Sequence, residues 1–133
     1  TQSAKYTVYD LIDLALKEDL AGLNRTTDLL KAEGVESMTA LWAISRELDI
    51  LLQIRYRIDQ GQSTNQALNS LRVWRSRESL VRSAVSRLSL TQLRKLLALC
   101  HDIDRNIKGA TREPAWAMIK DVLLGLAGHP MTR

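Results

Sequence analysis

Hydrophobic residues recur every three or four positions along most of this chain, and that spacing is typical of helices with one buried face. Two short helices are predicted first: one follows Thr7 as its N-cap, and the other ends at Gly34, with a break near Ala21-Gly22. A connection this short favours an antiparallel pair. The longest predicted helix has Ser37 as its N-cap and ends at Gly61. Its apolar stripe consists of Leu41, Ile44, Leu48, Leu51, Leu52 and Ile58.

The second half of the chain has the same period, with recognisable helix starts. A polar loop leads to a short helix at residues 66–71, and a further helix is predicted at residues 76–88. The run Ser89-Leu90-Thr91-Gln92 has the form of a capping box and predicts the start of another helix. Thr111 is predicted to cap the last helix, with Pro114 in its first turn. We therefore expect an all-α fold, a compact bundle of six or seven helices.

Nothing in the sequence divides the chain into parts. Residues 1–133 contain no internal repeat and no composition shift strong enough to mark a second domain, so we expect a single helical domain. The tails, residues 1–6 and 129–133, are expected to be mobile. Because the chain starts with Thr1 rather than Met, we expect it to be a fragment of a longer protein.

The composition supports the helical prediction. The chain has 23 Leu, no Phe, two Pro and six Gly, so helix formers are abundant while helix breakers and β-favouring aromatics are scarce. A single cysteine excludes an internal disulfide and a cysteine-based zinc site. No apolar run approaches the roughly 20 residues that a membrane span requires.

No arrangement of residues indicates a catalytic or metal site. There is no glycine-rich phosphate-binding run, and His101 and His129 lack partners at the spacing of metal ligands. Cys100 lies on an apolar helix face, where a buried hydrophobic role is far more common than a nucleophilic one. The carboxylates of Glu18-Asp19 are adjacent only in sequence. We therefore expect no enzyme activity, no cofactor and no metal in this chain.

The net charge of +4 hides an asymmetry along the chain. Residues 1–50 carry a formal charge of −4, whereas residues 51–133 carry +8. Between residues 72 and 95 there are seven bases and one acid, Glu78. Such a block can attract nucleic-acid phosphates, but it can equally be a solvated surface or pair with the acidic first third. The seven bases are Arg72, Arg75, Arg77, Arg82, Arg87, Arg94 and Lys95.

Residues 71–77 place a tryptophan among three arginines. Arginine can fork onto phosphate oxygens, and an exposed tryptophan can stack on a base. In the other interpretation, Val73 and Trp74 anchor the loop in the core while the arginines are solvated, and spacing alone favours this second interpretation. Trp42 and Trp116 lie on apolar helix faces and are expected in the core.

Several motifs follow one another in an order and spacing that resemble a known family. Arg72-Val73-Trp74-x-x-Arg77 is followed by Leu88-Ser89-x-Thr91-Gln92-Leu93-Arg94, and later by Trp116 and His129-Pro130. Upstream, Arg46-Glu47-Leu48 lies in the long predicted helix. Over nearly all of residues 5–130 the chain resembles the C-terminal domain of the delta subunit of the bacterial DNA polymerase III clamp loader. The pair of motifs around Trp74 and Ser89 is the most specific part of the resemblance.

This resemblance implies a role in assembly. In the family, the domain is a helical bundle that joins equivalent domains of other subunits in a circular collar, so the expected partners are the ATP-binding loader subunit and the delta-prime subunit. Primer–template DNA is a further expected partner, and no membrane is involved. The sliding clamp would be reached only through the N-terminal domains of delta, and a cytoplasmic location is expected.

The resemblance also suggests roles for individual residues. In clamp loaders the template strand leaves beside delta, and the basic segment matches that region of the family. Thr111 stands where some relatives carry an aromatic residue that could cap the primer end, so that contact is not expected here. Some of the apolar residues become candidates for subunit contacts. The expected DNA-binding residues are Arg72, Trp74, Arg75, Arg77 and Arg82, and the expected partner-binding residues are Leu52, Leu99 and Leu124.

Two other functions compete with the collar hypothesis. A free-standing helical DNA-binding module would use the basic segment 72–95 directly, and it predicts tight, salt-dependent DNA binding by the isolated chain. A small helical enzyme would require a cluster of polar residues in a pocket that the sequence does not predict.

Overall fold

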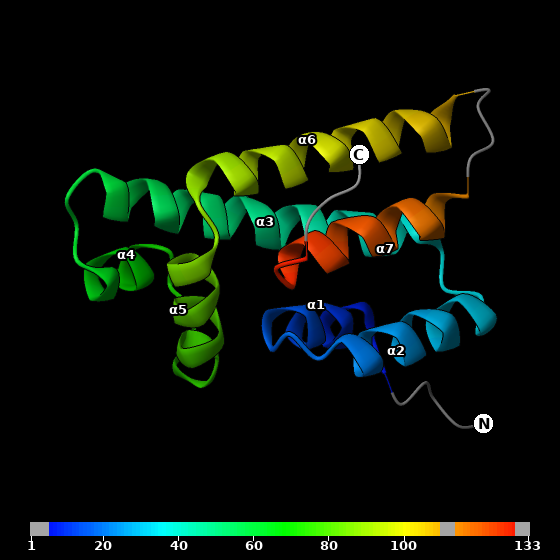
Figure 1. Ribbon diagram of the computed structural model, residues 1–133, viewed down its shortest axis with the longest axis horizontal. Coiled ribbons are helices and arrows are strands. Elements are labelled where there is room, and N and C mark those ends of the chain that lie inside the picture. Colours follow the sequence, from blue (N-terminus) through cyan, green and yellow to red (C-terminus); the bar gives the residue numbers. More distant parts are fainter. Residues whose placement is uncertain (1–5, 110–113, 130–133) are drawn as a thin grey trace.

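The computed structural model describes residues 6–109 and 114–129, and these residues form seven α-helices and one short 3-10 helix, with no strand. Figure 1 shows the helices in chain order. The all-α prediction is therefore confirmed. The elements are α1 (Val8–Leu16), α2 (Leu20–Ala32), α3 (Ser37–Asp59), α4 (Thr64–Ser70), η1 (Arg75–Arg77), α5 (Glu78–Arg87), α6 (Leu90–Lys108) and α7 (Ala115–Leu126).

The two long helices, α3 and α6, lie side by side along the length of the molecule (Figure 1). Helix α7 packs against both of them, and α1 packs against α3 and α7. Helices α1 and α2 form the predicted pair, below α3 in this view. Helices α4 and α5 lie against one end of α3, and this arrangement brings the segment between them close to α1.

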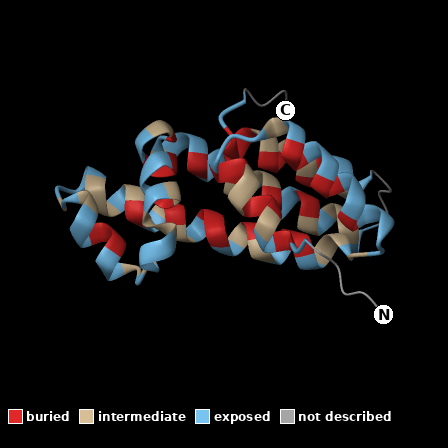
Figure 2. Ribbon diagram, turned by 90° about the horizontal axis from the view of Figure 1, so that it is seen from below, coloured by how far each residue is buried: buried red, intermediate tan, exposed pale blue. Residues whose placement is uncertain are grey.

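Buried hydrophobic side chains from all seven helices form one continuous cluster. Figure 2 shows the buried positions turned inward along each helix, with exposed positions on the outside. On α3 the predicted stripe is buried at Leu41, Ile44, Leu48 and Leu51. Each fully buried leucine or isoleucine contributes about 1.5–3 kcal/mol relative to an exposed one, so this cluster is the main source of stability.

Capping boxes start three of the helices. Thr7, Ser63 and Ser89 each accept a backbone N–H at the start of α1, α4 and α6, and the side chain three residues later accepts the N–H of the cap residue. The predicted caps at Thr7 and Ser89 are therefore confirmed, whereas no cap was predicted at Ser63. Each box satisfies two backbone donors that the helix itself cannot satisfy.

Some predicted boundaries were wrong. The break between the first two helices lies at residues 17–19, because Glu18 has a positive φ of 62° and Asp19 accepts the N–H of Gly22, which belongs to α2. Ser37 is the first residue of α3 and not its cap. Residues 75–77 form a 3-10 turn before α5 begins. Pro114 is the N-cap of α7, and the predicted cap Thr111 lies outside the described residues.

The prediction that Trp42 is in the core was wrong. Its side chain is 68% exposed on the outer face of α3. The stripe formed by Leu41, Ile44 and Leu48 turns inward, and Trp42 falls one residue outside it. Trp116 is half-buried and packs against the core cluster.

No described helix combines the length and apolar character needed to cross a bilayer.

Candidate nucleic-acid interface

The chain leaves α4 through a tight reversal at Arg72. The N–H of Val73 donates to the carbonyl of Leu68, and the N–H of Arg72 donates to that of Asn69, the pair of bonds that defines a Schellman motif. This motif needs a left-handed residue, and Arg72 takes that place with a φ of 55°. Glycine is the usual residue there, and an arginine costs about 1–2 kcal/mol more. The Schellman motif therefore ends α4 at this point.

Trp74 projects into solvent from this segment. Its side chain is 76% exposed, whereas Leu71 and Val73 are half-buried and pack against the core cluster. The loop is therefore anchored by two aliphatic residues and not by the tryptophan. The interpretation that places Trp74 in the core, which spacing favoured, is contradicted by this exposure.

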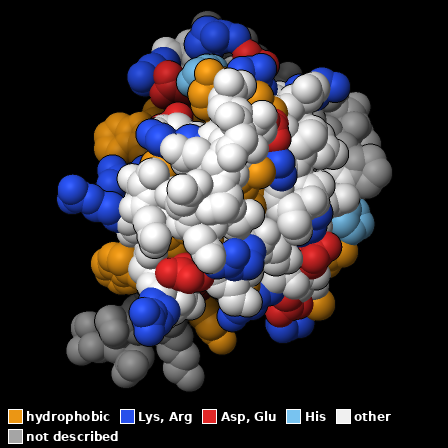
Figure 3. All heavy atoms as spheres, turned by 90° about the vertical axis from the view of Figure 1, so that its left-hand side faces the viewer, with side chains coloured by type: hydrophobic (Ala, Val, Ile, Leu, Met, Phe, Trp, Pro, Cys, Tyr) orange, Lys and Arg blue, Asp and Glu red, His pale blue; other side chains and the backbone are white. Residues whose placement is uncertain are grey.

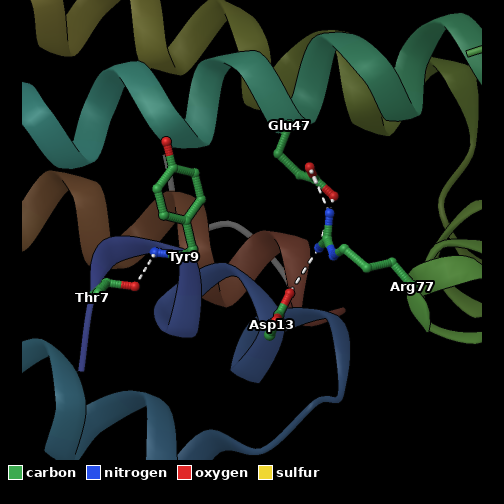
Figure 4. A network of polar contacts seen from close by, with 5 residues as sticks. All are labelled: Thr7, Tyr9, Asp13, Glu47 and Arg77. Carbon is green, nitrogen blue, oxygen red and sulfur yellow. Dashed lines mark hydrogen bonds and ion pairs between the residues drawn. The ribbon is translucent and has the colours of Figure 1, made fainter. Parts of the chain in front are cut away.

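Arg77, in contrast, belongs to a network with two carboxylates (Figure 4). Its Nη2 lies 2.7 Å from Asp13 Oδ1 and 3.3 Å from Glu47 Oε2, and its Nη1 lies 3.4 Å from Glu47 Oε1. Burial of the guanidinium lowers the pKa of Arg77, but the charges and hydrogen bonds of Glu47 and Asp13 outweigh this effect and raise the pKa above its ordinary value. The guanidinium thus joins η1 to α1 and α3.

Glu47 is one of the few buried polar residues among those described, with 7% of its surface exposed. A buried carboxylate is costly unless it is paired and hydrogen-bonded, and Arg77 provides both. The sequence did not single out Glu47 or Asp13 for this role. The only signal was the charge asymmetry, because pairing of the basic block with the acidic first third was one of the interpretations left open.

The five predicted DNA-binding residues fall into two groups. Arg72, Trp74 and Arg75 are exposed, and the guanidiniums of Arg72 and Arg75 have no hydrogen bond or ion pair within the described parts of the chain. Arg77 is held by its two carboxylates. Arg82 donates to Asn65 Oδ1 at 2.7 Å and lies 3.8 Å from Glu78 Oε1, so α5 is tied to α4 through it.

The rest of the basic block does not share a single role. Arg87 donates to the carbonyls of Leu126 at 2.7 Å and Leu16 at 3.1 Å, and its Nε lies 3.5 Å from Glu18 Oε2. Burial lowers the pKa of Arg87, partly offset by the charge of Glu18. This arginine therefore satisfies carbonyls at the ends of α1 and α7. Arg94 is exposed on α6 instead.

A groove of about 510 Å³ lies beside Trp74, between α1, α3 and the 71–77 segment. Trp74, Arg72, Tyr9 and Arg46 all line it, and Tyr9 is 64% exposed. Tyr9 and Arg46 were not predicted as site residues. Their local sequence does not indicate such a role, because they meet the basic segment only through the packing of α1 and α3.

The three predicted partner-binding leucines are each half-buried and pack against the core from outside. Leu52 lies on α3, Leu99 on α6 and Leu124 on α7. Leu99 also lines a hollow of about 650 Å³ between α6 and the end of α7. The three leucines therefore belong to three different helices.

The described residues contain no group of three or more His, Cys, Asp or Glu side chains that could hold a metal ion. Burial raises the pKa of the Cys100 thiol to about 11, against a small opposing effect of its hydrogen bond to Ser45. A thiol with such a pKa is not a nucleophile at neutral pH. His101 is exposed on α6.

Comparison with known proteins shows which family the chain belongs to. Residues 12–133 match the family described as the C-terminal domain of the processivity clamp loader gamma complex of DNA polymerase III. The chain belongs to this family. It is also similar to DNA polymerase III subunit delta of Escherichia coli (strain K12), with 27% identity over 133 residues. The alignment covers 97% of this chain, and the chain spans 37% of that relative's length.

Membership of the clamp-loader family confirms the resemblance found in the sequence. It also supports the expectation that this domain is a non-catalytic component of a clamp loader.

Proposed function

We propose that this chain is the collar domain of a clamp-loader delta subunit, working in the bacterial cytoplasm to hold the subunit in place within the loader. The observation that carries the proposal is the family match, which extends over residues 12–133. Half-buried leucines on α3, α6 and α7 are suited to subunit contacts, because burying apolar surface at an interface is favourable. The proposed partners are the ATP-binding loader subunit and the delta-prime subunit.

The assembly proposal is tested by a pull-down of the chain with each of these two subunits. We expect binding to at least one of them, and binding to neither would refute the proposal. Leu52→Gln, Leu99→Gln and Leu124→Gln, made one at a time, are expected to weaken binding wherever the leucine meets a neighbour. Thermal unfolding of each variant separates a lost contact from a lost fold, because these leucines also pack against the core.

The proposal includes a contact with the single-stranded template through the 72–75 part of the basic segment. Arg72 and Arg75 would bind backbone phosphates, and Trp74 would stack on a base. The exposure of Trp74 supports this role, since a stacking platform must be reachable. We assign Arg77 to positioning the segment rather than to DNA, because two carboxylates occupy its guanidinium. Arg82 would make at most a peripheral phosphate contact, in competition with Asn65.

The DNA contact is tested in full-length delta assembled into the loader. Trp74→Ala combined with Arg75→Ala is expected to reduce clamp loading on primed DNA while leaving assembly intact. Trp42→Ala is the matched control, because Trp42 is also largely exposed but lies outside the groove beside Trp74. Unchanged loading in the double variant would mean that the motif serves packing alone.

The alternative function, a free-standing DNA-binding module that uses residues 72–95, has less support. Three of its seven bases, Arg77, Arg82 and Arg87, already bond to protein groups. A module of this kind would bind DNA tightly without the other loader subunits, so the affinity of the isolated chain discriminates between the two functions.

A further inference from the structure

The groove beside Trp74 is built from α1, α3, the 71–77 segment and Val81 of α5. Helix α1 contributes Tyr9 and Ile12, α3 contributes Ala43, Arg46 and Ile50, and the 71–77 segment contributes the side nearest α5. Figure 3 views the end of the molecule formed by α4 and α5, where orange hydrophobic and blue basic side chains project together along the left edge. A volume of about 510 Å³ falls within the usual range for sites that bind small organic groups.

Two exposed aromatic side chains, Tyr9 and Trp74, line this groove. Trp74 is 76% exposed and Tyr9 is 64% exposed, although large aromatic side chains are usually well buried. Tyr9 stands in the first turn of α1, where its N–H donates to Thr7 Oγ1 at 3.2 Å, and its ring extends toward α3 (Figure 4). Both rings are therefore accessible to a ligand in the groove. The rest of the lining includes the aliphatic side chains of Ile12, Ala43, Ile50 and Val73.

The charges around the groove favour an anion. Asp13 and Glu47 are among its lining residues, but both are paired with Arg77, which leaves that trio with a charge of −1. Arg46 and Arg72 are exposed and carry no ion pair or side-chain hydrogen bond among the residues described. Adding their two charges gives the groove a net charge of +1. The guanidiniums of Arg46 and Arg72 are therefore available to a ligand, and they lie at the exposed part of the groove, where a phosphate would lie.

We propose that this groove holds an unstacked nucleotide of the single-stranded template, with its base against Tyr9 and Trp74 and its phosphates near Arg46 and Arg72. Stacking on aromatic rings and contact of arginine with phosphate are the two features that single-strand-binding sites combine. This inference rests on the proposed template contact and adds Tyr9 and Arg46 to it. The strand then crosses from the 72–75 segment toward α1 and α3, and not along α5 toward Arg82.

The test uses the loader assembled with full-length delta and a primed DNA whose fluorescein-labelled template overhang is oligothymidylate. Tyr9→Ala is expected to weaken binding of this DNA about tenfold, the usual consequence of losing one stacked base. Tyr9→Phe keeps the ring and is expected to bind like the wild type. Tyr56→Ala is the matched control, because Tyr56 is exposed on α3 but does not line the groove.

Arg46 is tested by the salt dependence of the same binding. Arg46→Gln is expected to lower the slope of log K against log salt by about 0.7, the value for one phosphate contact on a single strand. Arg94→Gln, which removes an exposed charge on α6, is expected to leave the slope unchanged. With 5-iododeoxyuridine in the overhang, photo-crosslinking is expected to label Tyr9 or Trp74.

The outcomes separate this inference from the proposed function. If Trp74→Ala weakens DNA binding but Tyr9→Ala and Arg46→Gln do not, the groove is not a nucleotide site and the template contact stands without it. If none of the three variants weakens DNA binding, the template contact fails as well. If Tyr9→Ala weakens association with a loader subunit and leaves DNA binding unchanged, the groove is a protein-docking surface and the inference is refuted.

Discussion

At the scale of single residues, the guanidinium of Arg77 joins three segments that are far apart in the sequence. It is 64 residues from Asp13 and 30 residues from Glu47. Removing one partner of a buried ion pair leaves the other charge uncompensated, which costs more than the intact pair contributes. The side chain of Glu47 is only 9% exposed, so Glu47 would bear that cost.

We therefore expect Arg77→Ala to lower the free energy of unfolding by about 2 kcal/mol, less than the roughly 3–5 kcal/mol typical of fully buried pairs, because Arg77 is partly exposed. Arg75→Ala is the matched control, since Arg75 has no ion pair in the described parts of the chain, and it should change stability by less than about 0.5 kcal/mol. Urea denaturation followed by circular dichroism gives both values. Equal effects of the two variants would show that the network contributes nothing.

The burial of Cys100 can be tested through the pH dependence of the free energy of unfolding. Its thiol pKa is raised from an ordinary 9.0 to about 11 in the folded chain. Above pH 9 the unfolded chain loses the thiol proton while the folded chain keeps it, so the free energy of unfolding falls as the pH rises. This contribution is complete below pH 9 and is lost as the pH approaches 11.

The size of the effect is roughly 3 kcal/mol, at about 1.4 kcal/mol for each of the two pKa units between 9.0 and about 11. The measurement is the difference in unfolding free energy between the wild type and Cys100→Ala at several pH values. We expect the wild type to lose stability relative to the variant between pH 9 and 11, and a difference that stays constant over this range would contradict the expectation. All other ionisable groups are common to both proteins, so their contributions cancel in the difference.

At the scale of elements, the sequence predicted what local chemistry determines. The period of apolar residues located the helices, and the Ser89–Gln92 pattern located the start of α6, because a capping box depends only on residues three apart. Boundaries set by backbone conformation were harder to predict. Glu18 and Arg72 both take left-handed conformations that glycine usually supplies, so no sequence signal marked the turns they form.

The capping box of α6 gives a prediction at this scale. Ser89→Ala removes the oxygen that accepts the N–H of Gln92 at 3.1 Å, so it should lower the free energy of unfolding by about 1 kcal/mol. Ser79→Ala, at an exposed position inside α5, should be neutral or slightly stabilising because alanine favours helices. Thermal or urea unfolding compares the two variants, and an equal response would mean that the cap is not significant.

At the scale of the whole molecule, the contacts between the basic segment and the other helices could not be predicted from the sequence. The basic segment around Trp74 was visible as a sequence motif, but its pairing with Asp13 and its proximity to Tyr9 depend on how α1 packs against α3 and α5. Trp42 was assigned to the core because its neighbours are apolar, and only the rotation of α3 about its axis determines that it faces outward.

The distribution of charge over the molecule predicts how the isolated chain binds single-stranded DNA. If only Arg46, Arg72 and Arg75 contact phosphates, the slope of log K against log salt is about −2, whereas engagement of all seven bases in residues 72–95 would give about −5. We expect the shallow slope, because three of those seven already bond to protein groups. A titration of fluorescence anisotropy at several salt concentrations measures the slope, and a steep one would favour the free-standing DNA-binding module.

The unequal exposure of the three tryptophans determines what optical spectroscopy can detect in this protein. Trp42 and Trp74 already lie largely in water, so denaturation changes the surroundings of their indoles very little. Only the half-buried Trp116 passes from packed side chains to solvent when the chain unfolds. Intrinsic emission therefore follows α7 rather than the entire bundle, and a small red shift on unfolding does not imply a loosely packed native state.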